Sequence, residues 1–232
     1  MKVEILTENQ AVKGEDYPIE VKVYESGAQL VPDSATITVK DPDGSEYVED
    51  QDMDVEAGVG TLTYTLTSTH TADLEEDCII EVTYTASDVD YKAVFLFDIV
   101  LNILKPCIID DDLKKYSPQI ASEIWATQTS YDPQIQEAWK ILYRDIKNKG
   151  RRPHMLIDGS QLRELHILKT FEITLFDFAR SAESIHWEKY LAYKERYTDL
   201  FDALIIKYDE DEDGLIDADE RADSMGQITL ER

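Results

Sequence analysis

The stretch Ile80-Glu81-Val82-Thr83-Tyr84 decides the fold of the first half of the chain, because apolar and polar side chains alternate along it. Successive side chains of a β-strand point to opposite faces, so this period of two places Ile80, Val82 and Tyr84 on one buried face. The same alternation appears in three other stretches, which are Ile19–Val23, Thr36–Lys40 and Leu62–Leu66. This part of the chain is therefore predicted to form strands that each turn one face to a core.

Turn residues separate these strands. In Asp41-Pro-Asp-Gly44, Pro42 sets its φ near the value that a tight turn needs, and Gly44 tolerates a positive φ. The stretch Tyr91–Val100 is more continuously apolar, as expected of a central strand. Roughly seven short strands in about 100 residues are typical of an immunoglobulin-like antiparallel β-sandwich, which we predict for residues 1–105. Neither a cysteine pair between the sheets nor a core tryptophan supports an antibody-type domain.

Past Pro106 the apolar period changes from two to 3.6 residues, which predicts helices. Asp110-Asp-Asp112 offers side-chain oxygens that cap a short helical segment, and this role is favoured over a metal site. A second cap is expected at Ser117-Pro118, with the proline in the first helical position. A longer helix is expected from Asp132-Pro133 to near Gly150, with one apolar face: Ile135, Trp139, Leu142 and Ile146.

Two further helices are expected to form a bundle with this one. The helix at about residues 160–182 is apolar on nearly all sides, so it must be surrounded by other helices or by subunits. The helix at about residues 184–208 carries a stripe that is most simply core, with a protein interface as the alternative. The stripe consists of Trp187, Tyr190, Tyr197, Phe201, Leu204 and Tyr208.

A basic cluster follows the first long helix and consists of Lys147, Lys149, Arg151 and Arg152. Basic side chains complement the partial negative charge of a helix C-terminus, so the simplest interpretation is a solvated cluster at that end. The alternatives are contact with nucleic acid or with an acidic neighbour.

The twelve residues Asp209-Glu-Asp-Glu-Asp-Gly-Leu-Ile-Asp-Ala-Asp-Glu220 match the EF-hand calcium loop at every diagnostic position. Gly214 permits the sharp turn at the sixth position, and Ile216 turns its side chain inward at the eighth. Six residues are predicted to supply oxygen ligands: Asp209, Asp211, Asp213, Leu215 through its carbonyl, Asp217 and Glu220. Such an all-oxygen shell suits Ca²⁺, and without a cation the eight carboxylates of the loop repel one another.

The loop is expected to be a structural calcium clip and not a sensor, with an acidic solvated loop as the alternative. EF-hands generally work in pairs, and the sequence contains no second loop of this kind. We therefore predict an α+β multidomain protein with the β-sandwich at residues 1–105. A helical domain follows at residues 106–232, in which the last long helix runs into the loop at 209–220 before an extended C-terminal tail.

The net charge of −26 is concentrated in two places. Residues 1–105 carry 23 acids and 6 bases, and eight further acids lie in residues 209–220. A field of this sign repels phosphate backbones and anionic membranes, so sequence-specific nucleic-acid binding and membrane binding are not expected. No apolar segment of signal-peptide length opens the sequence. Cys78 and Cys107 form no metal or disulfide pattern, so free thiols in a reducing cytoplasm are expected.

No arrangement of residues suggests a reaction, so the chain is not expected to be an enzyme. The four histidines lack zinc-ligand spacing, and His166 lies on an apolar helix, where a hydrogen-bonded core histidine is expected. No phosphate-binding loop, dinucleotide fingerprint or nucleophile elbow occurs. Carboxylates are too abundant for any pair of them to indicate glycosidase chemistry.

The second half of the chain, from about residue 109 to 232, resembles the head–tail adaptor (connector or neck) proteins of tailed bacteriophages. The resemblance rests on the order of several short stretches: an Asp-rich entry with Tyr116-Ser-Pro118, a helix ending near Gly150, Leu162–Leu168, the aromatic helix Trp187–Tyr197, Ile206–Gly214 and the terminal Ile228–Arg232. These are patterns of residue type and order, without an invariant catalytic motif.

This resemblance implies a non-enzymatic virion protein that forms a ring, dodecameric in the family, between the portal protein and the tail or neck proteins. It also implies assembly in the cytoplasm of the bacterial host. The β-sandwich resembles immunoglobulin-like domains that decorate phage structural proteins. The alternative function is a calcium-stabilised immunoglobulin-like module that binds a carbohydrate or protein ligand. The missing export signal argues against this alternative. The apolar helix at about residues 160–182 argues against it as well, because a small domain has too few other helices to cover it.

Overall fold

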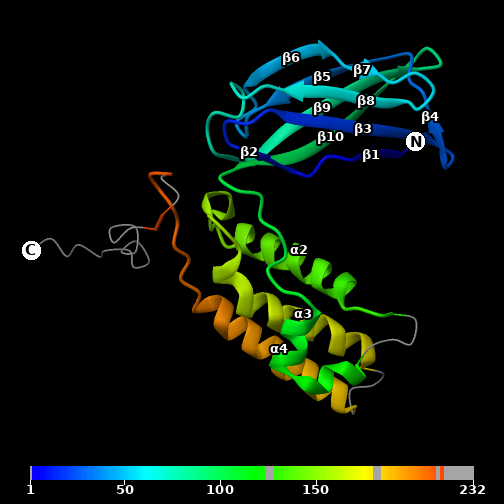
Figure 1. The fold of residues 1–232 in the computed structure, drawn as a ribbon. Helices are drawn as coiled ribbons and strands as arrows, with labels where there is room; N and C mark the ends of the chain where they lie inside the picture. Colours follow the sequence, from blue (N-terminus) through cyan, green and yellow to red (C-terminus); the bar gives the residue numbers. More distant parts are fainter. Residues whose placement is uncertain (1, 124–127, 180–183, 213–214, 217–232) are drawn as a thin grey trace, which may run out of the picture. The chain divides into compact units, whose positions relative to one another are not determined.

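The computed structural model describes residues 2–123, 128–179, 184–212 and 215–216 (Figure 1). The chain divides into two compact units, Met1–Ile103 and Leu104–Arg232. The described elements of the first unit are strands and those of the second are helices. The α+β fold class predicted from the sequence is therefore confirmed.

Ten strands make up the described part of the first unit. Their bounds are β1 (Lys2–Ile5), β2 (Gln10–Val12), β3 (Tyr17–Glu25), β4 (Ala28–Leu30), β5 (Ser34–Lys40), β6 (Glu46–Asp52), β7 (Asp54–Val55), β8 (Thr61–Leu66), β9 (Glu75–Ala86) and β10 (Val89–Val100). They form two five-stranded sheets, ordered β1-β3-β8-β7 with β4 beside β3, and β2-β10-β9-β5-β6. The pairing of β2 with β10 is parallel, and the other pairings in the described sheets are antiparallel.

The sequence predicted roughly seven strands, and the structure has more because β2, β4 and β7 are only two or three residues long. A strand of this length contains too little alternation to be recognised by its period. Its position depends on the neighbour with which it pairs, and that neighbour is distant in sequence for β2, which lies along β10.

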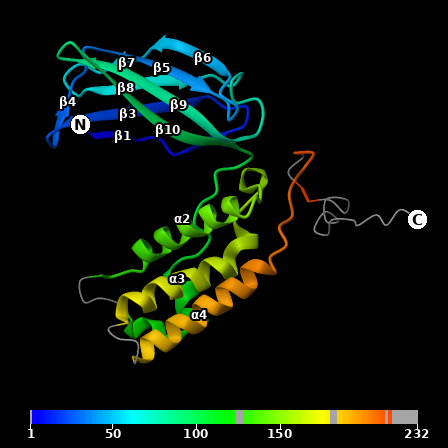
Figure 2. The same cartoon turned by 180° about the vertical axis from the view of Figure 1, so that it is seen from behind.

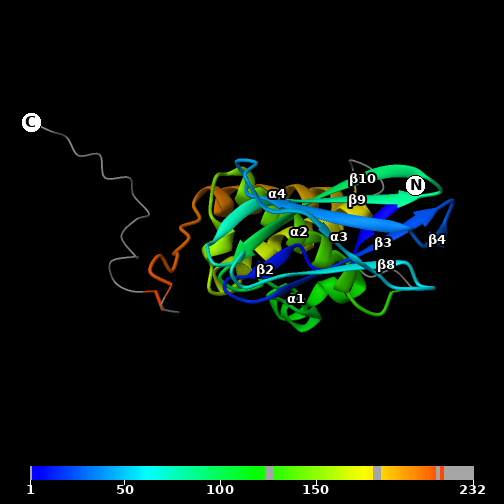
Figure 3. The same ribbon diagram turned by 90° about the horizontal axis from the view of Figure 1, so that it is seen from above.

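The two longest strands, β9 and β10, form a hairpin in which they run side by side (Figure 3). Its turn consists of Ser87 and Asp88, which have positive φ values of 53° and 62°. A two-residue turn with this backbone has a twist that matches the twist of the flanking strands. The turn therefore sets the register of the hairpin, starting with the pair Ala86 and Val89.

One buried cluster takes side chains from both sheets. Its members include three residues of β3 and three of β9, none of them more than 2% exposed: Ile19, Val21, Val23, Ile80, Val82 and Tyr84. The period of two predicted for these strands is confirmed. Because burial of one Val or Ile side chain contributes about 1.5–3 kcal/mol, this cluster is a principal source of stability for the unit.

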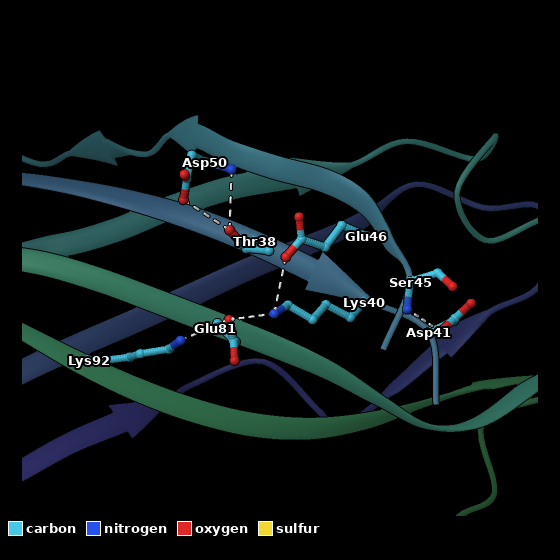
Figure 4. A network of polar contacts seen from close by, with 8 residues as sticks. All are labelled: Thr38, Lys40, Asp41, Ser45, Glu46, Asp50, Glu81 and Lys92. Carbon is cyan, nitrogen blue, oxygen red and sulfur yellow. Dashed lines mark hydrogen bonds and ion pairs between the residues drawn. The ribbon is translucent and has the colours of Figure 1, made fainter. Parts of the chain in front are cut away.

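The other face of the second sheet carries a row of alternating charges across β6, β5, β9 and β10 (Figure 4). Lys40 Nζ lies 3.1 Å from a carboxylate oxygen of Glu46 and 3.1 Å from one of Glu81. Lys92 Nζ lies 2.9 Å from the same oxygen of Glu81. The hydrogen bond from Lys92 lowers the pKa of Glu81 most, and the hydrogen bond from Lys40 lowers it further. Both lysines of this sheet are thus paired with carboxylates.

The described part of the second unit contains four α-helices and three short 3₁₀ helices. Their bounds are α1 (Asp110–Tyr116), η1 (Pro118–Ser122), α2 (Asp132–Asn148), η2 (Pro153–Met155), η3 (Ser160–Leu162), α3 (Arg163–Phe178) and α4 (Ile185–Asp202). α3 lies between α2 and α4 and contacts both (Figures 1 and 2). Within the described residues, none of these helices has the length and apolar character needed to span a membrane.

α2 begins where the sequence predicted, at Asp132 with Pro133 in its first turn. The four predicted core residues of its apolar face are all buried. After the helix, Gly150 adopts a φ of 72°, the left-handed conformation that glycine tolerates best. The predicted helix, its buried face and its glycine stop are confirmed.

The buried stretch of α3 is covered by elements of its own unit. Every residue from Leu165 to Phe171 is buried, and the clusters that contain them also contain side chains of α1, α2 and α4. The expectation that this helix needs more partners than the domain offers is therefore wrong for this stretch. The buried Lys169 forms an ion pair with Glu172, with Lys169 Nζ 2.7 Å from Glu172 Oε2. α3 is open to solvent at its two ends, where Arg163 and Glu164 are exposed and Phe176 is 53% exposed.

α4 ends at Asp202 and not near Tyr208, so the predicted helix is too long. Leu204, Ile206 and Tyr208 are half-buried against the helical core, while the residues between them are exposed. This alternation is the pattern of an extended chain. The sequence was misleading because Phe201, Leu204 and Tyr208 also fit the spacing of one helix face.

Candidate functional site

The segment that leads into the predicted calcium loop is extended, and side chains fix it to the helical unit. Gln161 Nε2 donates a hydrogen bond to the carbonyl oxygen of Lys207 (2.9 Å), and Gln161 Oε1 accepts one from the N–H of Lys207 (3.0 Å). The backbone N–H of Arg152 donates to the hydroxyl of Tyr208 (3.1 Å), and the Arg152 guanidinium lies 4.7 Å from the centre of the Tyr208 ring. The entrance to the loop is thus held at two successive residues.

The basic cluster after α2 binds the end of α4 and the segment that follows it. Three contacts show this: Lys149 Nζ to Asp202 Oδ1 (2.9 Å), Arg151 Nη2 to the carbonyl of Phe201 (3.3 Å) and Arg152 Nη2 to Glu210 Oε1 (2.6 Å). Of the interpretations left open by the sequence, an acidic neighbour is found for Lys149 and Arg152, and this neighbour belongs to the same chain. Arg151 complements the C-terminus of α4, and not that of α2 as the sequence predicted.

Half of the predicted calcium ligands belong to the described part of the chain. Asp209, Asp211 and Leu215 are described, whereas three others lie outside the described residues: Asp213, Asp217 and Glu220. Asp209 is fully buried. Within the described ranges, no three His, Cys, Asp or Glu side chains are placed to hold a metal ion together. The calcium site therefore stays a prediction.

The approach to this loop differs from that of an EF-hand, in which a helix enters the loop directly. Here the non-helical residues 203–208 separate α4 from Asp209. The prediction that the last long helix runs into the loop is therefore wrong. The donors still fit the ion in kind, because carboxylate and carbonyl oxygens are the ligands that Ca²⁺ prefers. Within the loop, Glu212 has a φ of 61°, so the backbone turns sharply there.

The aspartates at the start of α1 cap the helix and tie it to other segments. Asp112 accepts a hydrogen bond from the N–H of Ile109 (3.0 Å) and lies 2.8 Å from Arg163 Nη2. The hydrogen bond from Ile109 is the larger cause that holds the pKa of Asp112 below its usual range, and Arg163 lowers this pKa further. Asp110 accepts a hydrogen bond from the N–H of Tyr131 (2.8 Å). The capping role is confirmed, although Ile109 and not an aspartate occupies the N-cap position.

Cys107 and His166 form a pair that the sequence analysis did not foresee, because they are 59 positions apart. Cys107 Sγ lies 3.5 Å from His166 Nδ1, and His166 Nε2 lies 2.8 Å from the carbonyl oxygen of Ile135. A carbonyl oxygen only accepts, so Nε2 carries the proton and Nδ1 is left to accept from the thiol. His166 is fully buried, which confirms the predicted hydrogen-bonded core histidine.

The protonation states of this pair oppose nucleophilic chemistry. Burial raises the pKa of the Cys107 thiol to about 11 and lowers the pKa of His166. A Cys–His nucleophile needs a thiolate beside an imidazolium, and the surroundings disfavour both charged forms. Cys107 and Cys78 are free thiols, as predicted. The pair therefore acts as a hydrogen-bonded link inside the helical unit.

A second polar cluster joins η1 to the first turn of α4. Glu123, which is only 9% exposed, lies 3.3 Å from His186 Nδ1 and 3.7 Å from Lys189 Nζ. A small cavity beside it is lined partly by the apolar side chains of Ile120 and Phe171. Nothing in the sequence signals this cluster, because Glu123 is one acid among many and its partners lie on another helix.

Comparison with known protein families and with curated proteins finds no match to this chain. Functional assignment therefore depends on the order and chemistry of the elements described above.

Proposed function

We propose that this protein is a non-enzymatic structural component of a tailed-phage virion, a head–tail adaptor that forms a ring between the portal and the tail or neck proteins. The observation that carries the proposal is the order of elements in the helical unit. The Asp-rich α1, the proline-initiated η1, α2 with its glycine stop, the central α3 and the aromatic α4 follow one another. This is the order on which the adaptor resemblance rests. Such a protein is assembled into virions in the bacterial cytoplasm.

The polar clusters of the helical unit support a role that depends on surfaces and not on a reaction. Asp112 with Arg163, Glu123 with Lys189, and the Cys107 pair each join segments that are distant in sequence. Contacts of this kind hold short helices in one arrangement, which a ring subunit needs in order to present the same faces to each neighbour. The Cys107 thiol, which burial keeps protonated, fits that structural role.

We infer that the first unit is an immunoglobulin-like β-sandwich that decorates the adaptor. The order β1-β3-β8-β7 corresponds to the A-B-E-D sheet of such domains, and β10-β9-β5 corresponds to G-F-C, with β6 added as C′. The buried cluster shared by the two sheets supports the same assignment. The acidic surface of this unit does not attract DNA that passes nearby.

The loop at residues 209–220 is proposed to bind one structural Ca²⁺ ion. Its donor set supports this, as does the fixation of its entrance by Gln161 and Arg152. A chain that is already held at one end loses less conformational entropy when it closes around an ion. In this role the bound ion fixes the loop that follows α4 to the helical unit.

Electron microscopy of the purified chain with the portal protein encoded in the same gene neighbourhood tests the adaptor proposal. The expected result is a second ring stacked on the portal ring, with both proteins sedimenting together. A helical unit with this role should also be encoded beside capsid and tail genes. The proposal fails if no portal gene lies nearby, or if the portal sediments without this chain at every concentration tried.

A calcium-stabilised immunoglobulin-like binding module is the second candidate, and one observation favours it. Val94 and Leu96 are 55% and 56% exposed on β10, on the side of the sheet opposite the buried cluster. Exposed apolar side chains on a sheet face commonly serve recognition. Specific and calcium-dependent retention of one glycan on an array, lost on substitution of Leu96→Ser, would favour this function over the adaptor.

A further inference from the structure

The face of α4 that points away from the helical core is acidic. Glu188, Glu195 and Asp199 are exposed and lie at positions i, i+7 and i+11, which places them on one side of the helix. None of the three forms an ion pair with another described residue. Asp202 extends this face, but it is already paired with Lys149. We refer to Glu188, Glu195 and Asp199 as the acidic face.

The outward face of α2 is basic. Lys140 and Arg144 are exposed and one turn apart, and Lys147 follows on the same side as a half-exposed residue. Neither Lys140 nor Arg144 has a hydrogen bond or ion pair within the described part of the chain. Glu137 is the acid nearest to them on this side of the helix. We refer to Lys140 and Arg144 as the basic face.

The two faces lie on different sides of the helical unit. α2 and α4 both pack on α3, which lies between them (Figures 1 and 2), and each turns its buried residues inward. One chain therefore presents two surfaces of opposite charge that are available to different neighbours.

We infer that the protein associates head to tail, with the basic face of one copy against the acidic face of the next. The chain carries a net charge of −26, so two copies repel each other over most of their surfaces. On the described part of the helical unit, the basic face is a surface that attracts an acidic surface of a second copy. A contact between two different faces of the same chain is heterologous, and it yields a ring when its rotation closes. The ring form rests on the proposed function, whereas the contact itself rests on the two faces.

Charge reversal tests this contact, with sedimentation velocity of the full-length chain over a series of concentrations as the measurement. The first variant reverses the basic face (Lys140→Glu with Arg144→Glu), and the second reverses the acidic face (Glu195→Lys with Asp199→Lys). Each variant presents two faces of like charge and should associate at least about tenfold more weakly than the wild type. Salt alone does not decide the question, because it weakens both the local attraction and the general repulsion.

Mixing the two variants is the decisive step. In the mixture, the reversed α2 of the first variant matches the reversed α4 of the second, and their unchanged faces match as well. The mixture should associate at least about tenfold more strongly than either variant does alone. Recovery on mixing also shows that both variants are folded. Failure to recover overturns the contact, as does a wild-type chain that remains monomeric at every concentration.

Matched controls change the charge equally at other exposed sites. Lys115→Glu with Lys207→Glu controls for the first variant, and Glu20→Lys with Glu25→Lys controls for the second. Both controls should associate as the wild type does, and loss of association in either overturns the contact.

If the two face variants still form wild-type rings on the portal, this interface is wrong while the adaptor function stands. If the wild type binds no portal, the adaptor function fails by its own test.

Discussion

The side-chain amide of Gln161 pairs with both backbone groups of Lys207, which lies 46 positions further along the chain. One glutamine thereby occupies the place that a neighbouring strand would take beside an extended chain. This relationship explains why the chain leaves helical geometry after α4, although its apolar spacing also suits a longer helix. It also sets the position from which the predicted calcium loop begins.

Replacing Gln161 with alanine should loosen the segment that enters the loop. The two backbone groups of Lys207 lose their partners, and each hydrogen bond of this kind contributes about 0.5–1.5 kcal/mol. Urea denaturation should show a loss of about 1–2 kcal/mol, and the Lys207 amide should exchange with solvent at least about tenfold faster. Gln161→Glu is the matched control, because it keeps the acceptor for the Lys207 N–H and should slow that exchange relative to alanine. An unchanged exchange rate in the alanine variant would contradict the role of this pair.

His166 should make the helical unit sensitive to acid. Burial lowers its pKa in the folded chain, whereas the unfolded chain titrates near 6.5. Below that pH the unfolded chain binds more protons, so the free energy of unfolding should decrease as the pH falls from about 6.5 to the folded pKa. Above about 6.5 this contribution is complete.

The measurement is the urea midpoint at about pH 7 and about pH 5.5 for the wild type and for His166→Gln. Glutamine does not titrate, so the variant should lose less stability between the two pH values than the wild type does. His70→Gln, in the first unit, is the matched control and should keep the wild-type dependence. Equal pH dependence in the wild type and His166→Gln would show that His166 does not cause it.

Calcium should raise the melting temperature of the wild type but not that of a chain lacking two predicted ligands. Asp209→Ala with Glu220→Ala removes one carboxylate from each end of the loop, so bound Ca²⁺ no longer stabilises the folded state. Glu212→Ala with Asp219→Ala removes the same charge at loop positions that are not ligands, and it should keep the calcium-dependent shift. Calorimetric scans with Ca²⁺ and with a chelator provide the measurement. Identical scans of the wild type in both conditions would exclude calcium-linked stabilisation.

Two neighbouring residues of β9 should differ sharply in their effect on stability. Ile80 is fully buried in the shared cluster, so Ile80→Ala should cost about 2–5 kcal/mol through lost contacts and a cavity. Glu81 lies on the other face in the row of charges, and Glu81→Gln should cost less than about 1 kcal/mol. Chemical denaturation of both variants makes the comparison. Similar losses for the two would contradict the assignment of these faces to core and solvent.

Local sequence patterns predicted those strands and helices in which the buried residues recur at a regular spacing. The alternation in β3 and β9 identified their buried residues, and the apolar face of α2, with Pro133 and Gly150, identified that helix. Two- and three-residue strands contain no such pattern, so their existence was not foreseeable. The predicted calcium ligands follow from spacing alone, and only three of the six lie within the described ranges.

The sequence by itself determined where strands give way to helices, because alternation and helical period are properties of consecutive residues. It also determined the acidity of the first unit. Only the tertiary structure decided where α4 ends, which histidine meets a cysteine and which helix faces stay exposed. The first two outcomes depend on contacts between residues 46 and 59 positions apart, and no local pattern encodes such contacts.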